Sequence, residues 1–179
     1  GIGRTFQNLQ LCDNMTMLEN VMCGQHRFAT QAVLPIALHW IGEREEAEVR
    51  RAALEALGFV GLQGAELQDP AALPFGHQRL VEIARALALR PRLLLMDEPA
   101  SGLNDAETER LAELIVRIAA LGVTVLVVEH DMRLVMGLAD HVVVMDHGEM
   151  IAQGPPDLVR DDPAVIAAYL GQEVRARAA

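Results

Sequence analysis

The sequence predicts an α/β fold in which a mostly helical segment precedes a parallel sheet. In the C-terminal half, strand-sized apolar runs alternate with helical patterns, as a parallel α/β sheet requires. Two of these runs, "RLLLMD" and "VTVLVV", are continuously apolar, which is typical of strands buried on both faces. Earlier in the chain, residues 16–30 and 43–58 carry helical periodicity, and residues 59–76 form a loop rich in Gly, Pro and Asp.

Two helices flank the first of these strands. One is predicted over residues 77–90 and ends before Pro91. Its apolar face is formed by Leu80, Ile83, Ala84 and Leu87. The other begins after Asn104, which can cap it together with Glu107 in a variant of the capping box, and it ends at Gly122. Its predicted buried stripe is formed by Leu111, Leu114, Ile115 and Ile118.

The last third of the chain predicts a hairpin between helices. A short helix is expected in "DMRLVMGLA" and a strand in "HVVVM". The tight turn "DHGE" then pairs that strand with "MIAQG". Residues 154–157 open a further helix with proline in its first turn.

Composition limits the classes of function. A formal net charge of −10 argues against a general nucleic-acid surface. No apolar run reaches the roughly 20 residues of a bilayer-spanning helix. Cys12 and Cys23 lack the spacing of metal ligands and suit a reduced cytosolic protein. All 15 basic residues are arginine, so every phosphate site that depends on lysine is excluded from this sequence.

Polar side chains follow two successive strands. Asp97 and Glu98 follow the first strand, and His130 follows the second in "VVEHD". Ligands of open α/β sheets bind beyond the carboxyl ends of the strands. There an Asp can hold Mg²⁺, a Glu can polarise an attacking water, and a His can hydrogen-bond a terminal phosphate. Taken alone, the acids are better explained as a strand cap and the histidine as a structural side chain, but their coincidence at one edge favours function.

Two other stretches offer groups to a ligand. The amide of Gln7 in "RTFQN" can bridge a metal ion and a water. The turn "LPFGHQR" precedes a helix, whose N-terminus attracts anions, and Gly76 allows the backbone to approach closely. Taken singly, an ordinary loop and an ordinary loop-to-helix junction account for both.

Taken in order, these stretches resemble the ATP-binding subunits of ABC transporters over the whole chain. Gln7 matches the Q-loop, "LPFGHQR" the signature motif, "LLLMDEP" the Walker B strand, "SGLND" the D-loop and His130 the switch histidine. The resemblance implies a P-loop NTPase of RecA-like type, an ABC ATPase core with a parallel sheet and a helical subdomain. It divides the chain into a Q-loop segment (1–15), a helical subdomain (16–76), an α/β ATPase core (77–153) and C-terminal helices (154–179).

The resemblance also implies a transport-coupled ATPase with ATP and Mg²⁺ as cofactors. Glu98 and His130 correspond to the catalytic residues of the family. Asp97 and Gln7 correspond to the residues that hold the metal. The nucleotide-binding positions are Gln7, Gly76, His77, Gln78 and Asn104.

The implied partners are a second ATP-binding subunit, which completes two shared ATP sites, and the membrane permease subunits. Through the permease the protein would serve a periplasmic or extracellular solute-binding protein, without nucleic acid, from the cytoplasmic face of the inner membrane. Met15, Met17 and Leu18 suit a contact with the membrane subunits, because Met adapts to irregular surfaces. They suit the small core of the helical subdomain equally well.

Within the family, "GRTFQNLQLCDNMTMLENV" and the closing "VIAAYLG" resemble the ATP-binding subunits of branched-chain amino acid importers. The lipopolysaccharide-export ATPases share part of this pattern and are the alternative subgroup. DNA-repair and chromosome-organising ATPases carry long coiled-coil arms or a zinc hook, and the short insertion here has no heptad pattern.

The sequence departs from the family in three places. The phosphate loop G-x-x-x-x-G-K-[ST] is absent, because the chain has no lysine. We therefore expect the chain to be the C-terminal two-thirds or so of a longer protein, inactive alone; a non-catalytic interaction module is the rival hypothesis. In the signature, His77 replaces the usual Gln and Pro74-Phe75 the usual Ser-Gly, and the D-loop ends in Asn104 where many relatives have Asp.

Overall fold

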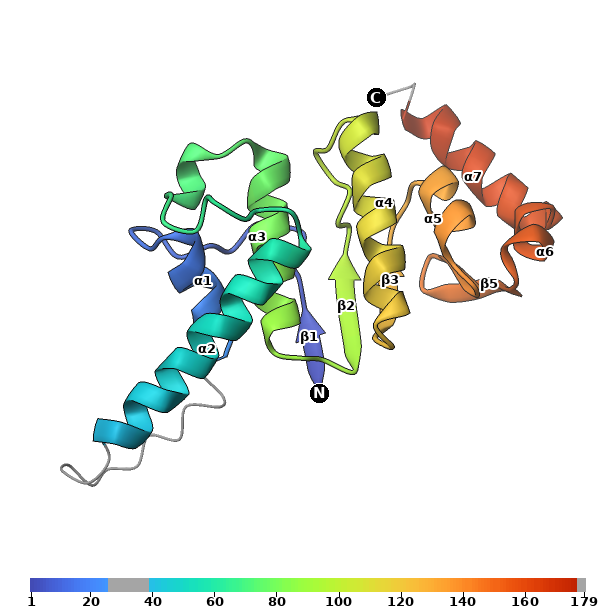
Figure 1. Cartoon of the computed structure of the whole chain (residues 1–179). Helices are drawn as coiled ribbons and strands as arrows, with labels where there is room; N and C mark the ends of the chain where they lie inside the picture. The colour runs from blue at the N-terminus through green and yellow to red at the C-terminus, as the bar shows by residue number, and fades with distance from the viewer. Residues whose placement is uncertain (26–38, 177–179) are drawn as a thin grey trace. The chain divides into compact units, whose positions relative to one another are not determined.

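The computed structural model describes residues 1–25 and 39–176, which form two compact units, Gly1–Val128 and Glu129–Ala179 (Figure 1). The first unit contains a parallel sheet and a group of helices. The second contains a two-stranded hairpin with three helices. The predicted α/β class with an additional helical region is confirmed.

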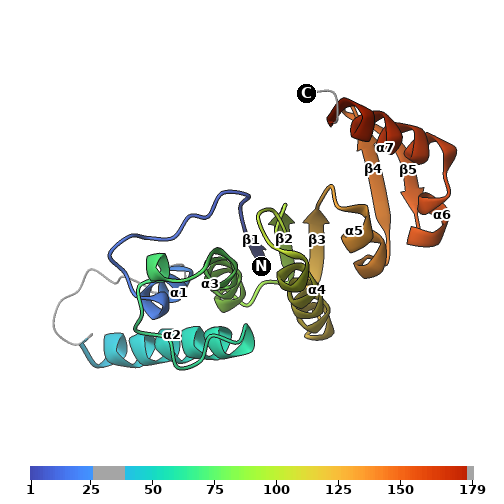
Figure 2. The ribbon, with the colours of Figure 1, turned by 90° about the horizontal axis from the view of Figure 1, so that it is seen from above.

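The parallel sheet has the strand order β1 (Ile2–Arg4), β2 (Leu93–Asp97) and β3 (Thr124–Val128). Figure 2 shows the three strands side by side; helix α3 contacts β1 and helix α4 contacts β3. In the register, Ile2 lies opposite Leu93 and Leu93 lies opposite Thr124. The sheet therefore joins the first residues of the unit to its last ones.

Burial differs between the two strands that the sequence predicts to be buried on both faces. In β2 the side chains of Leu94 and Met96 are fully buried, and the intervening ones are half-buried. In β3 that prediction is wrong, since Leu126 and Val128 are about half exposed. Exposed residues alternate with half-buried ones along β3, so one face of this strand is left largely uncovered by the described residues, which its own apolar run does not encode.

The helical part of the first unit consists of α1 (Met17–Cys23), α2 (His39–Phe59), the 3₁₀ turn η1 (Pro70–Ala72) and α3 (Phe75–Ala88). Helices α1, α2 and α3 contact one another in pairs. The prediction of a helix over 43–58 is confirmed. Of the helix predicted over 16–30, the structure confirms α1, which ends at the C-cap Gly24. Residues 26–30 lie outside the described residues.

Burial distinguishes the two explanations of the methionine-rich start of α1, namely a contact with membrane subunits and the core of the helical subdomain. Met17 and Leu18 are 0% and 2% exposed, so they belong to the core between the helices. Met15 is 38% exposed. Of these three residues, only Met15 presents a substantial surface.

Helix α3 begins at Phe75, two residues before its predicted start, with Pro74 at the N-cap. It ends at Ala88 rather than at residue 90, because Arg90 adopts a left-handed conformation (φ 47°) that no helix can continue. Ile83 and Ala84 of the predicted apolar face are fully buried.

Helix α4 (Asp105–Ala120) connects β2 to β3 and follows the sequence prediction closely. The Oδ1 of Asn104 accepts a hydrogen bond from the backbone N–H of Glu107, and the carboxylate of Glu107 accepts one from the N–H of Asn104. This confirms the capping box. The buried residues of the helix are the four predicted ones, Leu111, Leu114, Ile115 and Ile118.

The second unit contains α5 (Met132–Leu138), the antiparallel hairpin β4 (Val142–Asp146) and β5 (Glu149–Gly154), α6 (Pro156–Arg160) and α7 (Pro163–Ala176). Both turn residues, His147 and Gly148, have positive φ (48° and 85°), as the predicted tight turn requires. The predicted short helix, hairpin and proline-initiated helix are all confirmed. Within residues 1–25 and 39–176, no helix is long and apolar enough to span a membrane.

Candidate functional site

The carboxyl end of β2 presents two acidic residues, of which the second has an unusual backbone conformation. Asp97 is the last residue of the strand, and Glu98 follows it with φ 43°. The N–H of Glu98 donates to the carbonyl of Val128 over 2.9 Å, which ties this turn to the end of β3. A non-glycine residue in the left-handed region costs about 1–2 kcal/mol, and such strain often marks functional positions.

Gln7 reaches this edge from the segment that follows β1. Its Nε2 donates a 2.7 Å hydrogen bond to Oε2 of Glu98, although the two residues are 91 positions apart. The structure therefore brings together two residues that the sequence assigned to one site. The amide of Gln7 holds one carboxylate oxygen of Glu98 at the sheet edge.

Arg4 is a member of this edge that sequence reasoning missed. Its Nη2 lies 3.4 Å from Oδ2 of Asp97, and the two side chains are about half exposed (52% and 41%). Its guanidinium also lies over the ring of Phe6, 4.9 Å from the centroid. The available signal was its place at the end of a strand adjacent to the one that ends in Asp97. Solvent screening keeps such a pair weak.

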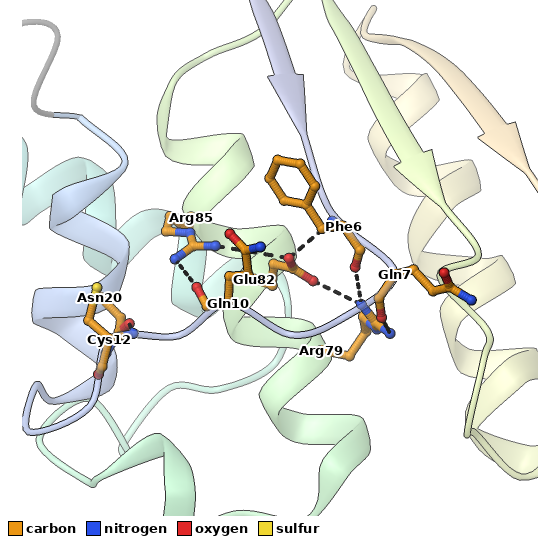
Figure 3. A network of polar contacts seen from close by, with 8 residues as sticks. All are labelled: Phe6, Gln7, Gln10, Cys12, Asn20, Arg79, Glu82 and Arg85. Atoms are coloured by element: carbon orange, nitrogen blue, oxygen red, sulfur yellow. Dashed lines mark hydrogen bonds and ion pairs between the residues drawn. The ribbon is translucent and has the colours of Figure 1, made fainter.

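A buried network on α3 holds the backbone around Gln7, and this too was missed (Figure 3). Arg79 donates to the carbonyls of Phe6 and Gln7, and Glu82 accepts from the N–H of Phe6. Arg85 donates to the carbonyl of Gln10. The three side chains follow one another at intervals of three residues on one face of the helix, and that spacing was the signal in the sequence.

The turn that begins α3 packs against the start of α4. A Cβ added to Gly76 would lie 2.7 Å from Oε1 of Glu107, and one added to Gly102 would lie 3.0 Å from the ring of Phe75. Gly76 is thereby placed beside the capping box of Asn104, another predicted site residue. The sequence predicts that another group can approach the backbone closely at Gly76. In this structure, that group is the carboxylate of Glu107.

The other two predicted residues of this turn differ in exposure. His77 is exposed, whereas Gln78 is half-buried and donates through Nε2 to the carbonyl of Leu73 over 2.9 Å. Within the described part of the chain, no side chain caps the N-terminus of α3. Its first N–H groups and positive dipole end can therefore face an anion.

His130 belongs to the second unit, Glu129–Ala179, two residues after the end of β3. Its side chain is 75% exposed, and its Nδ1 lies 3.9 Å from Oε2 of the buried Glu129. The same carboxylate oxygen accepts a hydrogen bond from the backbone N–H of His130 over 3.2 Å. The first unit thus assembles Gln7, Asp97 and Glu98, and His130 is described with the second unit.

The donor atoms at the edge of the sheet suit a hard cation. Asp97 and Glu98 offer carboxylate oxygens and Gln7 offers an amide oxygen, which are the ligand types that Mg²⁺ prefers. Among residues 1–25 and 39–176 there is no group of three or more His, Cys, Asp or Glu arranged to enclose a metal. Mg²⁺ is typically held by one or two carboxylates together with phosphate oxygens of a substrate, so these residues fit that ion.

Two protein-family models match the chain. The model described as "ABC transporter" matches residues 1–101. The model described as "Branched-chain amino acid ATP-binding cassette transporter" matches residues 149–175.

Curated relatives align with nearly the whole chain. The high-affinity branched-chain amino acid transport ATP-binding protein BraF of Pseudomonas aeruginosa is 42% identical over 174 residues, which are 96% of this chain and 68% of the relative. The protein LivG of Escherichia coli K12, of the same description, is 38% identical with the same coverage.

Solved structures show the same fold. A nucleotide-free ATP-binding cassette from an ABC transporter has a TM-score of 0.76 at 33% identity, covering 94% of this chain and 68% of that one. An ATP-binding cassette of an ABC transporter in its ADP conformation has a TM-score of 0.77 at 30% identity, covering 96% and 68%.

Proposed function

Because the chain belongs to the ABC transporter ATP-binding family, we propose that it serves an importer of branched-chain or related amino acids as its ATP-hydrolysing subunit. The family itself accounts for binding and hydrolysis of ATP. The cargo of transport is supported by the match of residues 149–175 and by the relatives BraF and LivG, which are described as high-affinity branched-chain amino acid transport ATP-binding proteins. The inward direction rests on the resemblance of the sequence to the importer subgroup.

The observation that carries the catalytic part of the proposal is the 2.7 Å hydrogen bond from Gln7 to Glu98. A general base must be held within hydrogen-bond reach of the water it activates. The amide of Gln7 fixes one oxygen of Glu98. The backbone of Glu98 is in a strained conformation, and its N–H donates to the carbonyl of Val128. The carboxylate of Glu98 is then the group that accepts the proton of the attacking water.

Asp97 and Gln7 would hold Mg²⁺, which neutralises charge on the phosphate oxygens when it is bound. His130 would donate a hydrogen bond to the terminal phosphate, and its exposed side chain is accessible for that role. The uncapped start of α3, with Gly76, His77 and Gln78, would face the nucleotide of a second ATP-binding subunit. Asn104 would contribute to the same junction, because its hydrogen bond with the N–H of Glu107 holds that residue beside Gly76.

The proposed partners are that second subunit and the membrane permease subunits, which in turn meet a periplasmic or extracellular solute-binding protein. The proposed location is the cytoplasmic face of the inner membrane. Met15 is suited to the permease contact, because it is 38% exposed and lies just before α1. Nucleic acid is not a proposed partner, given the net charge of −10.

The test uses the full-length product of the gene, reconstituted with its permease in proteoliposomes. Glu98→Gln should lower the ATPase rate by about 100-fold or more while ATP stays bound, because the base is lost and the shape is kept. The matched control is Glu113→Gln, an exposed position on α4, which should hydrolyse ATP at the wild-type rate. Uphill uptake of labelled leucine tests the cargo.

Three results would contradict the proposal. Normal hydrolysis by Glu98→Gln would remove the role of that carboxylate. A wild-type protein that neither binds nor hydrolyses ATP would favour a non-catalytic module. Hydrolysis without uptake of any hydrophobic amino acid, but with outward movement of lipopolysaccharide, would favour the export subgroup.

A further inference from the structure

We propose that Arg79 and Glu82, two buried side chains of α3, are positioning residues that set the place of Gln7 opposite Glu98. This inference rests on the proposed function, because it assigns these residues a part in the same site. They touch neither of the acids at the sheet edge. They act through the backbone of the segment that carries Gln7.

Arg79 binds the carbonyl oxygens on both sides of the Phe6–Gln7 junction (Figure 3). Its Nη1 donates to the carbonyl of Phe6 over 2.7 Å, and its Nη2 donates to the carbonyl of Gln7 over 2.8 Å. A planar guanidinium presents its donors in a rigid fork that fixes two acceptors relative to each other, whereas an ammonium carries rotatable donors on a flexible stem. The backbone around Gln7 is therefore fixed in both position and orientation.

Glu82 completes the hold on the same backbone. Its Oε1 accepts from the N–H of Phe6 over 3.1 Å, and its Oε2 accepts from Nη1 of Arg79 over 2.9 Å. Both polar groups of the Phe6 backbone are thus bound by α3. One turn further, Arg85 donates to the carbonyl of Gln10 and approaches Glu82.

A buried ion pair is weak evidence for a contribution to stability, so the burial of Arg79 and Glu82 leaves room for a positioning role. Arg79 and Glu82 are each 1% exposed. Desolvation of two buried charges offsets much of their attraction, and apolar pairs of similar volume are often as stable. The ion pair does provide something that an apolar pair does not, because it holds three backbone groups of Phe6 and Gln7 at fixed distances.

The consequence is a direct connection between two parts of the proposed site. The first turn of α3 carries Gly76, His77 and Gln78, and the next turn carries Arg79 and Glu82. A displacement of α3 is transmitted to Gln7 through hydrogen bonds of 2.7–3.1 Å. Because the Gln7–Glu98 contact is itself 2.7 Å long, a shift of about 1 Å would break it.

The decisive variant is Arg79→Lys in the full-length protein, which keeps the charge opposite Glu82 but lacks the rigid planar fork that holds both carbonyls in a fixed relation. We expect kcat for ATP hydrolysis to fall about 10-fold with KM for ATP changed less than about 2-fold, as for loss of an interaction that acts on the chemical step. The same substitution in a Gln7→Ala background should have no further effect, because Arg79 acts through Gln7.

The control is Leu57→Ala in the core of the same helical part, where the side chain is fully buried. It should lower the melting temperature and combine additively with Gln7→Ala in kcat. Additive effects of Arg79→Lys and Gln7→Ala, or an unchanged kcat in Arg79→Lys, would overturn the proposal.

Hydrogen–deuterium exchange provides a readout that does not depend on ATP hydrolysis. The amide of Phe6 should exchange at least about 10-fold faster in Arg79→Lys, with the amides of β2 unchanged, because only the hold on the segment is lost. If the wild-type protein hydrolyses no ATP, the proposed function fails and exchange still decides the positioning role. Unchanged exchange at Phe6 would overturn it.

A second variant covers the case in which Arg79→Lys does not fold. The double substitution Arg79→Met with Glu82→Leu removes both charges together and leaves neither unpaired in the interior. It should show the same loss of kcat and the same fast exchange at Phe6. Wild-type values of both in a folded double variant would also overturn the proposal.

Discussion

The left-handed backbone of Glu98 predicts that glycine is tolerated better than alanine at this position. Glu98→Ala and Glu98→Gly both lose the carboxylate and its hydrogen bond with Gln7, so their difference isolates the backbone. At φ 43° a Cβ costs about 1–2 kcal/mol, which glycine avoids. The greater freedom of glycine in the unfolded chain costs about 0.4–1 kcal/mol in return. Glu98→Gly should therefore be more stable than Glu98→Ala by about 0.5–1 kcal/mol.

Urea denaturation measures this difference. With an m-value of about 2 kcal/mol/M, the midpoint of Glu98→Gly should lie about 0.3–0.5 M above that of Glu98→Ala. The matched control is Glu113 in the interior of α4, where the backbone is helical and the side chain is exposed. There alanine should be more stable than glycine by about 1 kcal/mol, so the two sites differ in sign.

The reasoning fails if the alanine variant at position 98 is more stable than the glycine variant by the same margin as at position 113. That result would mean that the turn after β2 relaxes to negative φ without cost. Glu98 would then have ordinary backbone geometry, and the strain could not contribute to the placement of its carboxylate.

Two further predictions concern the packing of α1. Burial raises the pKa of the Cys23 thiol, so its thiolate fraction at pH 8 is reduced; iodoacetamide should alkylate Cys23 several-fold more slowly in the native protein than in urea, and equal rates by mass spectrometry would refute this. Gly24→Ala should destabilise the protein by about 1–3 kcal/mol in thermal unfolding, because a Cβ there would overlap the carbonyl of Arg85 and lie 2.8 Å from its Cγ. Gly137→Ala is the control, since open space surrounds that position, and an equal loss in both variants would contradict the packing argument.

The features that the sequence predicts correctly are those set by neighbouring residues. The capping box of Asn104 and Glu107 depends on residues three positions apart, and the structure forms it as expected. The turn at His147 and Gly148 is equally local. Such elements can be predicted because the groups that stabilise them lie within one turn of the chain.

The features that escaped prediction depend on distant parts of the chain. Arg79 is bound to a carbonyl 73 positions away, and no pattern of side chains marks a backbone acceptor in advance. The exposure of Leu126 depends on which face of β3 is covered by other parts of the chain. Gln7 and Glu98 were assigned to one site only through the order of motifs, and their direct contact was not predicted, because a loop residue and a strand end carry no mutual signal.

The parallel pairing of Ile2 with Leu93 also has a consequence for folding and for evolutionary change. In the sequence, the helical part of the first unit lies between β1 and β2, and these two strands are neighbours in the sheet. Closing such a loop costs only about 0.6 kcal/mol more for each doubling of its length. The helical part can therefore gain or lose residues between lineages at little cost to the sheet, whereas β1 can join β2 only after a long-range closure, so we expect β1 to enter the sheet late in folding.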